Sequence, residues 1–166
     1  MARKSRYRRY RRGRWSSNIT ELNHIALTFA SGESSATATL VTNPAQSNLS
    51  TSQTYTVKNI ELNYLMEGNP TNTDNINVYI MFVPQGMNVS SDYNIQHPEY
   101  IMAHRMQGNG AYNNQQYFQP LRIKTRLARR LNTGDSIILF IKMLNSSNSD
   151  EGTQLNGIVK WWSKAN

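Results

Sequence analysis

Apolar and polar residues alternate along this chain in short runs, and turn-forming residues separate the runs. Residues 54–66 alternate with a period of two, which is the period of a strand with one buried face. The run at 97–110 fits a strand or one to two helical turns, and we favour the strand. No 3.6-residue pattern extends beyond two turns. We therefore expect about eight strands, within residues 19–31, 35–41, 54–66, 76–84, 97–110, 121–130, 136–143 and 155–162.

Two of these runs allow finer predictions about which side chains reach the core. The apolar phase of residues 54–66 switches near Asn59, which predicts a bulge or bend inside one long strand. In residues 19–31, strict alternation places Leu22 on one face and Ile25 on the other.

Three runs are apolar on both faces: residues 78–83, residues 137–141 and the pair Trp161 and Trp162. A sandwich strand needs only one apolar face, so we expect something outside the domain to cover the second face. Cover by the chain's own loops or arm is the alternative. Consecutive strand residues point to opposite faces, so the two tryptophans cannot both enter the same core. One of them is therefore a candidate anchor for an interface.

Many short strands, evenly separated by turn residues, predict an all-β sandwich or barrel. Eight strands with long connections favour a single eight-stranded jelly-roll sandwich. We expect residues 17–166 to form this domain and residues 1–16 to form a separate basic arm. Because the chain has no cysteine, disulfides and thiolate metal sites are excluded.

The arm, MARKSRYRRYRRGRW, contains eight bases and no acid. The whole chain has 18 Lys and Arg against 10 Asp and Glu, so the remainder carries 10 of each and the net charge of +8 lies in the arm. Such a run predicts a disordered segment that binds a polyanion through arginine forks and aromatic stacking. A solvated tail is the alternative. The candidate nucleic-acid contacts are Arg3, Lys4, Arg6, Tyr7, Arg8, Arg9, Tyr10, Arg11, Arg12, Arg14 and Trp15.

A later strand adds a second basic feature. Arg122, Lys124 and Arg126 lie on one side of it, about 7 Å apart. Arg130 follows further along, and Arg129 lies beside it. The spacing is close to that of successive phosphates along an extended single strand, so this row is a second candidate for nucleic-acid binding. An edge strand protected by charge, or salt bridges to a neighbour, is the alternative.

The pattern does not support catalytic chemistry. No GxSxG motif surrounds a serine, and His24, His97 and His104 are interpreted as structural or surface residues. Asp150 and Glu151 are at most candidate ligands of a divalent ion on a loop. We therefore expect no enzymatic activity, no catalytic residues, no cofactor and no metal. The chain also has no apolar run long enough for a membrane span and no visible secretory signal.

The order of these features resembles the capsid proteins of small circular single-stranded DNA viruses that encode a replication initiator, the circovirus-like group. In that group an Arg- and Tyr-rich arm opens the chain. Basic residues and a Leu-Asn-Xaa-Gly-Asp turn precede a late apolar strand, and an aromatic strand closes the chain. The matching segments here are MARKSRYRRYRRGRW, RLARRLNTGDSIILFIKM and GIVKWWSKAN.

The resemblance implies a jelly roll that assembles, in about sixty copies, into an icosahedral shell with its arms facing a packaged single-stranded DNA genome. The resemblance implies that the arm bases bind the genome. Residues 122–130 match the family's motif, but the resemblance assigns them no role. It also implies a virion location, and passage through the host nucleus where the host is eukaryotic. The small size leaves a satellite RNA virus capsid, and thus RNA, as an alternative. A monomeric nucleic-acid-binding β-barrel with a basic tail is the rival hypothesis.

Overall fold

The structure, a computed structural model, describes residues 14–29, 32–43, 54–68, 73–108, 121–145 and 151–165. Residues 1–13, which make up most of the arm, lie outside the described residues. The strands are β1 (Ser16–Phe29), β2 (Gly32–Thr42), β3 (Tyr55–Gly68), β4 (Thr73–Val83), β5 (Ile101–Gly108), β6 (Leu121–Thr125), β7 (Arg129–Leu131), β8 (Ser136–Asn145) and β9 (Glu151–Ala165). Two short helices, α1 (Tyr93–Gln96) and the 3-10 turn η1 (Pro98–Tyr100), complete the described chain.

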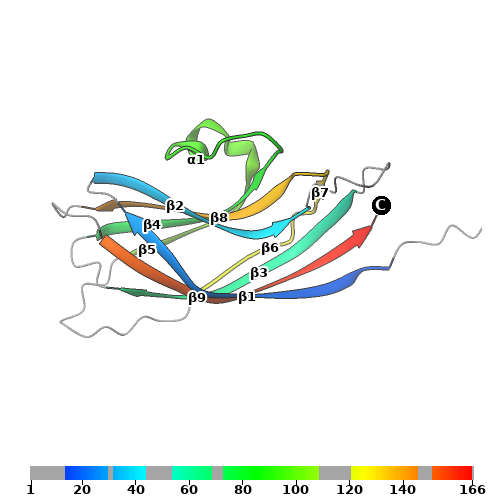
Figure 1. Cartoon of the computed structure of the whole chain (residues 1–166), viewed down its shortest axis with the longest axis horizontal. Helices are drawn as coiled ribbons and strands as arrows, with labels where there is room; N and C mark the ends of the chain where they lie inside the picture. The colour runs from blue at the N-terminus through cyan, green and yellow to red at the C-terminus, as the bar shows by residue number, and fades with distance from the viewer. Residues whose placement is uncertain are drawn as a thin grey trace, which may run out of the picture.

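The strands form two antiparallel sheets that pack face to face (Figure 1). The β1 sheet has the order β1-β9-β3-β6, with β7 also paired to β3, and the β2 sheet has the order β2-β8-β4-β5. Inward side chains of both sheets form one core, in which Val57, Ile60, Val78 and Leu139 are buried. The predicted all-β sandwich is confirmed.

The order of strand pairing identifies this sandwich as a jelly roll. Both β6 and β7 pair with β3, so they are two halves of one sixth strand. Counted in this way, strand 1 pairs with strand 8, 2 with 7, 3 with 6, and 4 with 5. Such nested pairs arise when one long hairpin wraps around a common core, which is the jelly-roll arrangement of eight strands. The prediction of an eight-stranded jelly roll is therefore confirmed.

A bulge in β3 interrupts two strand ladders at the same height. Asn59 has a φ of 52°, and the register of β3 against β9 shifts between Lys58 and Glu61. On the other side of β3, residues 126–128 separate β6 from β7 opposite the same point. The bulge predicted from the phase switch near Asn59 is confirmed, and it also explains why the strand predicted at 121–130 is split.

A second bulge, in β1, corrects the sequence analysis. His24 has a φ of 51°, and the register against β9 shifts between Leu22 and Ile25. The inserted residue turns both Leu22 and Ile25 toward the core, so the prediction that they lie on opposite faces is wrong. The backbone N–H of His24 donates to Oδ1 of Asn156 at 2.8 Å, which holds the bulge against β9. Asn and His tolerate positive φ better than most residues, and this is the signal that strict alternation missed.

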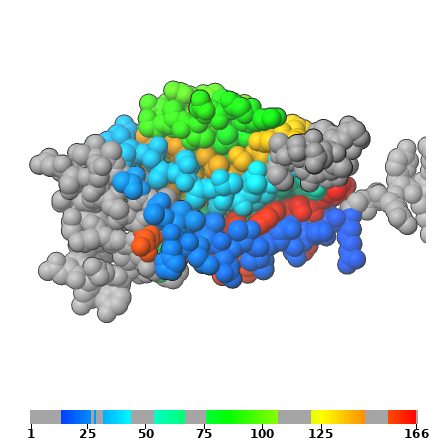
Figure 2. Space-filling view, in the orientation of Figure 1, coloured from blue at the N-terminus to red at the C-terminus, as the bar shows by residue number. Residues whose placement is uncertain are grey.

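The chain itself covers the outer face of the β2 sheet. Residues 84–100, here called the cap segment, include α1 and η1 and lie over this face (Figure 1, Figure 2). Tyr93 of the cap segment is fully buried and packs with Met81, Ile138 and Phe140 in a second apolar cluster. For residues 78–83 and 137–141, the expectation that another molecule must cover the second apolar face is therefore wrong. Cover by the chain's own loop, the alternative, is what the structure has there. For Trp162, which is exposed on the other sheet, cover by another molecule stays a prediction.

The cap segment also resolves the ambiguous run at 97–110. Pro98 opens the 3-10 turn, since a proline at the first position of a helical turn loses no hydrogen bond. The strand begins only at Ile101 and pairs with β4. The preferred prediction of a strand is confirmed from that residue onward, and the helical alternative describes the few residues before it.

Candidate nucleic-acid interface

The described part of the arm packs onto the β1 sheet where the arm ends. Arg14 is exposed, while Trp15 is half-buried beneath Lys58, whose Nζ atom lies 3.9 Å from the centre of the Trp15 ring. This cation–π contact ties the last residue before β1 to β3, two strands away in the sheet order. The remaining arm candidates, from Arg3 to Arg12, lie outside the described residues.

The two tryptophans of β9 point to opposite faces of the sheet, as predicted. Trp161 is partly buried and packs against the main core, whereas the side chain of Trp162 is 43% exposed on the opposite face. Lys160 and Lys164 share the outward phase of Trp162, and both flank it along the strand. The outer face of the β1 sheet thus carries a tryptophan between two lysines. The role of a tryptophan as an interface anchor stays a prediction.

The basic row on β6 lies on this same outer face. Arg122 and Lys124 are exposed, while Ile123 between them is buried in the core. The Nη2 atom of Arg122 lies 2.7 Å from Oε2 of Glu61 on the neighbouring strand β3. Hydrogen bonds from Arg122 and Asn63 hold the pKa of Glu61 below its usual value. One base of the row is therefore paired within the sheet, as the salt-bridge alternative anticipates.

The other two bases of the row differ in their surroundings. Arg126 is exposed directly after β6. Arg130 is exposed on β7, opposite Thr56 of β3, and its Nη2 atom donates to Oγ1 of Thr54 at 3.3 Å. Since Lys164 of β9 also pairs with Thr56, Arg130 and Lys164 flank the same residue of β3.

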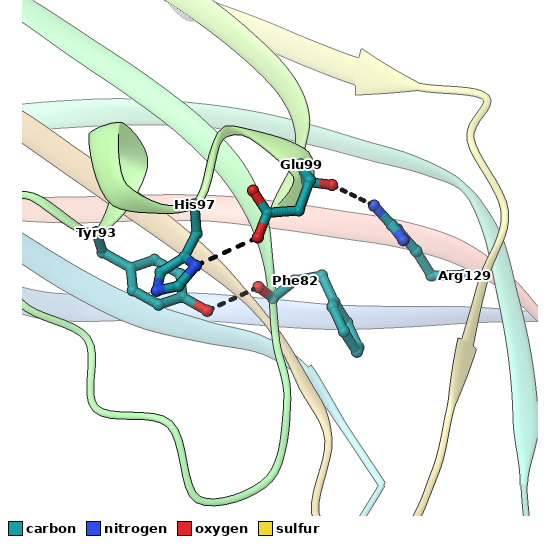
Figure 3. A network of polar contacts seen from close by, with 5 residues as sticks. All are labelled: Phe82, Tyr93, His97, Glu99 and Arg129. Carbon is teal, nitrogen blue, oxygen red and sulfur yellow. Dashed lines mark hydrogen bonds and ion pairs between the residues drawn. The ribbon is translucent and has the colours of Figure 1, made fainter.

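Arg129 does not join the row. It shares the inward phase of Leu131 and reaches the cap segment, where its Nη2 atom donates to the main-chain carbonyl of Glu99 (Figure 3). Its guanidinium group also lies over the ring of Phe82. The structure therefore places Arg129 between the sandwich and its cap, away from the other candidate bases.

Three lysines on this face were not identified from the sequence: Lys58, Lys160 and Lys164. Lys58 and Lys160 lie in outward phase on predicted strands, so the alternation contained their signal, whereas Lys164 lies beyond the predicted end of the last strand at residue 162. The alternation could not reveal the sheet order, because nothing in the local sequence indicates that β9 lies between β1 and β3.

Together these residues form what we call the basic face, the outward side of the β1 sheet and its rim. Among the described side chains its acids are Glu21 and Glu61. Its bases are Arg14, Lys58, Arg122, Lys124, Arg126, Arg130, Lys160 and Lys164.

The opposite side of the molecule has no such excess of bases among its described side chains. Among the described side chains there, Glu33, Asp92 and Glu99 are exposed acids of the β2 sheet and the cap segment. The described bases of this sheet and its cap are Arg105 on β5, Arg129 against the cap segment, and Lys142. Lys142 is buried, with its Nζ atom 2.6 Å from Glu33 and 2.9 Å from Asp92. Burial opposes the charge of Lys142, but its hydrogen bonds to both acids outweigh this and raise its pKa. The fold thus gathers seven of the ten bases outside the arm on the basic face.

The three histidines have local structural contacts. His24 forms the β1 bulge, and His104 stacks on Tyr79 at 4.4 Å. His97 lies 3.2 Å from Glu99 and beside Tyr93 (Figure 3). Within the described ranges, no three His, Asp or Glu side chains gather closely enough to hold a metal ion. The side chains of Asp150 and Glu151, named as possible divalent-ion ligands, lie outside the described part. No helix of the described chain is long and apolar enough to cross a membrane.

No family model matches the chain, and no curated protein matches it. Among solved structures, it is similar to a chain of infectious bursal disease virus, Gx strain, with 8% identity and a TM-score of 0.42. That match covers 90% of this chain and 32% of the virus chain, so this chain spans about a third of its length.

Two further structures match at a similar level. The Eiger TNF of S. frugiperda has 11% identity and a TM-score of 0.33, over 84% of this chain and 92% of that one. A lipoprotein of Bacteroides thetaiotaomicron has 9% identity and a TM-score of 0.36, over 89% of this chain and 95% of that one. Matches at these identities and TM-scores assign no family, and the jelly-roll assignment rests on the strand pairing of the chain itself.

Proposed function

We propose that this chain is a viral capsid protein, which assembles into a small icosahedral shell and packages a single-stranded DNA genome through its Arg-rich arm. The observation that carries the proposal is the combination of a complete jelly roll with an arm of eight bases and no acid that enters directly at β1. Jelly rolls are a recurrent capsid fold, but lectins and cupins share them, so the arm is needed for the argument.

The Leu-Asn-Xaa-Gly-Asp turn supports the same proposal through its structural role. It lies between the second half of the sixth strand and β8, and Gly134 within it has a φ of 87°. The carboxylate of Asp135 accepts backbone hydrogen bonds from Asn132 at 2.7 Å and from Gln85 at 2.9 Å. The motif therefore has a defined function in closing this end of the sandwich, consistent with the resemblance to circovirus-like capsid proteins.

The total positive charge of the arms is similar to the negative charge of a small single-stranded genome. About sixty arms with eight bases each supply roughly 480 positive charges, which is of the order of the phosphates in a genome of about one to two thousand nucleotides. Phosphate neutralisation of this kind is largely independent of sequence. The genome would then be held by the assembled shell rather than by a single recognition site.

A monomeric nucleic-acid-binding module is the second candidate, and the cap segment favours it. Because the chain covers the doubly apolar β2 sheet itself, that sheet no longer requires a second molecule. Assembly would then use other surfaces, and the large apolar residues exposed among the described ones are Ile19, Ile95, Met106, Leu127, Ile158 and Trp162.

Sedimentation and negative-stain microscopy of the purified full-length protein distinguish the two candidates. Closed particles of uniform diameter are expected for a capsid protein. A species that remains near 19.0 kDa at every protein and salt concentration would exclude the shell. Nuclease digestion of the co-purifying nucleic acid then separates DNA from RNA and identifies its strandedness.

Salt titration tests the role of the arm. If all eight arm bases engage a single strand, log K falls with log salt at a slope approaching about −6. Replacement of the eight arm bases by Gln should remove most of that slope. An unchanged slope in this variant would show that the arm does not bind the genome.

A further inference from the structure

We infer that the basic face is itself a binding surface for single-stranded nucleic acid, which continues the path of the arm across the β1 sheet. The inference rests on the proposed function, and it adds a site on the folded domain with its own residues. Four observations support it: the charge of the face, its exposed tryptophan, the geometry of its rows and the place where the arm enters.

The charge of the face fits a polyanion. Its bases outnumber its acids, and one of the two acids, Glu61, is already neutralised by Arg122 at 2.7 Å. Lys124, Arg126, Lys160 and Lys164 are on this face, and the structure shows no ion pair for them among the described residues. Outside the arm the sequence has equal numbers of acids and bases, so the clustering of the other bases on this face follows from the fold.

The exposed tryptophan favours single strands over a duplex. Trp162 is 43% exposed, and the register places Ser17 on one side of it and Lys58 on the other. An aromatic face beside lysines is the arrangement on which unstacked bases lie while their phosphates meet the charges. Bases of a duplex are already stacked and paired, so the ring would contribute nothing to duplex binding.

The rows of the sheet give the surface a direction. Glu61 lies opposite both Lys124 and Lys160, and Thr56 lies opposite both Arg130 and Lys164. Bases on β6 and β7 therefore face bases on β9 across β3, at two strand spacings of about 4.8 Å each. A single strand that follows β3 is contacted from both sides.

The arm enters at the same surface. Trp15, the last residue before β1, contacts Lys58 of this face, and Arg14 precedes it. Nucleic acid held by the arm is thereby delivered to Trp15 and Trp162 without crossing to the other side of the sandwich. The side with Glu33, Asp92 and Glu99 has no comparable excess of bases among the described residues.

The test uses full-length protein and labelled (dT)20. One variant combines Lys124→Gln, Lys160→Gln and Lys164→Gln on the basic face. A comparison variant with the same loss of charge combines Arg3→Gln, Arg6→Gln and Arg8→Gln in the arm, and under the proposed function it lowers the magnitude of the slope by a similar amount. We expect the face variant to reduce the magnitude of the salt slope by about 2, as three lost phosphate contacts require.

Trp162→Ala provides the second readout, with Ile19→Ala as its control, because Ile19 is also exposed on this face but has no ring. Loss of one base-stacking platform should weaken (dT)20 binding about tenfold for Trp162→Ala and leave it unchanged for Ile19→Ala. Ultraviolet cross-linking of the wild type should attach (dT)20 to the peptide that contains Trp162. Circular dichroism confirms that each variant is folded.

Three outcomes would overturn the inference, and they differ in what they mean for the proposed function. Cross-links confined to residues 1–15, with a normal slope for the face variant, assign all binding to the arm and leave the proposed function intact. Changes in sedimentation without changes in (dT)20 affinity would make the face a contact between copies of the chain. A wild type that binds no nucleic acid at any salt concentration would remove both proposals.

Discussion

The Nζ atom of Lys142 lies 2.9 Å from Oδ1 of Asp92, so a buried base on the inner strand β8 holds an acid of the cap segment. Lys142 also holds Glu33, which belongs to β2 and not to the cap segment. The two acids therefore share one partner but have different structural consequences. This difference makes the attachment of the cap segment testable.

We predict that Asp92→Asn loosens the cap segment and that Glu33→Gln does so much less. Both changes remove one carboxylate from Lys142, but only Asp92 connects it to α1, whose backbone begins with hydrogen bonds to the Asp92 carbonyl. Hydrogen exchange of the Gln96 and His97 amides should accelerate several-fold in Asp92→Asn while the β8 amides stay protected. Equal acceleration in both variants would mean that the cap segment is held by Tyr93 and its apolar neighbours alone.

The contribution of Lys142 should disappear at high pH. Its pKa is raised in the folded state, so its stabilisation is fully present below about 10.5 and is lost as the pH rises through the folded value. The difference in unfolding free energy between wild type and Lys142→Met should therefore shrink above pH 10.5. Urea unfolding at several pH values measures it. A difference that stays constant to pH 12 would assign the effect to packing of the lysine stem.

Asp135 should be the most sensitive residue of the Leu-Asn-Xaa-Gly-Asp turn. Its buried carboxylate accepts hydrogen bonds from two backbone N–H groups, one in the turn and one after β4. Asp135→Ala leaves both donors without this partner and should lower the unfolding free energy by about 3 kcal/mol. Asp135→Asn keeps one acceptor oxygen and should cost roughly half as much. If both variants unfold like wild type, the turn is held by Gly134 and the strand ends.

Gly157 should not tolerate a side chain. It pairs with Tyr64 of β3, and a Cβ atom there would lie 2.7 Å from the carbonyl oxygen of Asn63 and 3.1 Å from Cβ of Tyr64. Backbone cannot yield as a flexible side chain does, so Gly157→Ala should cost about 2–3 kcal/mol. Gly86→Ala, at a φ of 80° with open space around it, should cost only about 1 kcal/mol. Equal losses of stability in Gly157→Ala and Gly86→Ala would show that β3 and β9 move apart easily.

Two buried tyrosines should respond differently to loss of the hydroxyl group. The hydroxyl of Tyr93 donates to the carbonyl of Phe82 at 3.2 Å, whereas that of Tyr64 has no partner among the described residues. Burial raises the pKa of each to about 12, so both are neutral at physiological pH. Tyr93→Phe should lose about 1 kcal/mol of stability, while Tyr64→Phe should change it little or raise it. A larger loss for Tyr64→Phe would reveal a partner for its hydroxyl group.

Local patterns in the sequence determined the strands, one bulge and one turn of this protein. Alternation predicted the strands, the bulge at Asn59 and the opposite orientations of Trp161 and Trp162, because side-chain direction along a strand depends only on the residue and its neighbours. The Leu-Asn-Xaa-Gly-Asp turn was equally readable, since Gly134 and Asp135 act within a few residues. The even number of strands and their long connections were enough to favour a jelly roll.

Only the tertiary structure decided what covers the doubly apolar strands and where the charges gather. The apolar residues of the cap segment lie singly between polar ones, so nothing local shows that Tyr93 packs over Phe140. Likewise, Lys58 and Lys160 share a face only because β9 inserts between β1 and β3, a pairing of segments far apart in the chain. Balanced charge outside the arm is a property of composition, whereas the gathering of most of its bases on the outer face of the β1 sheet follows from strand order.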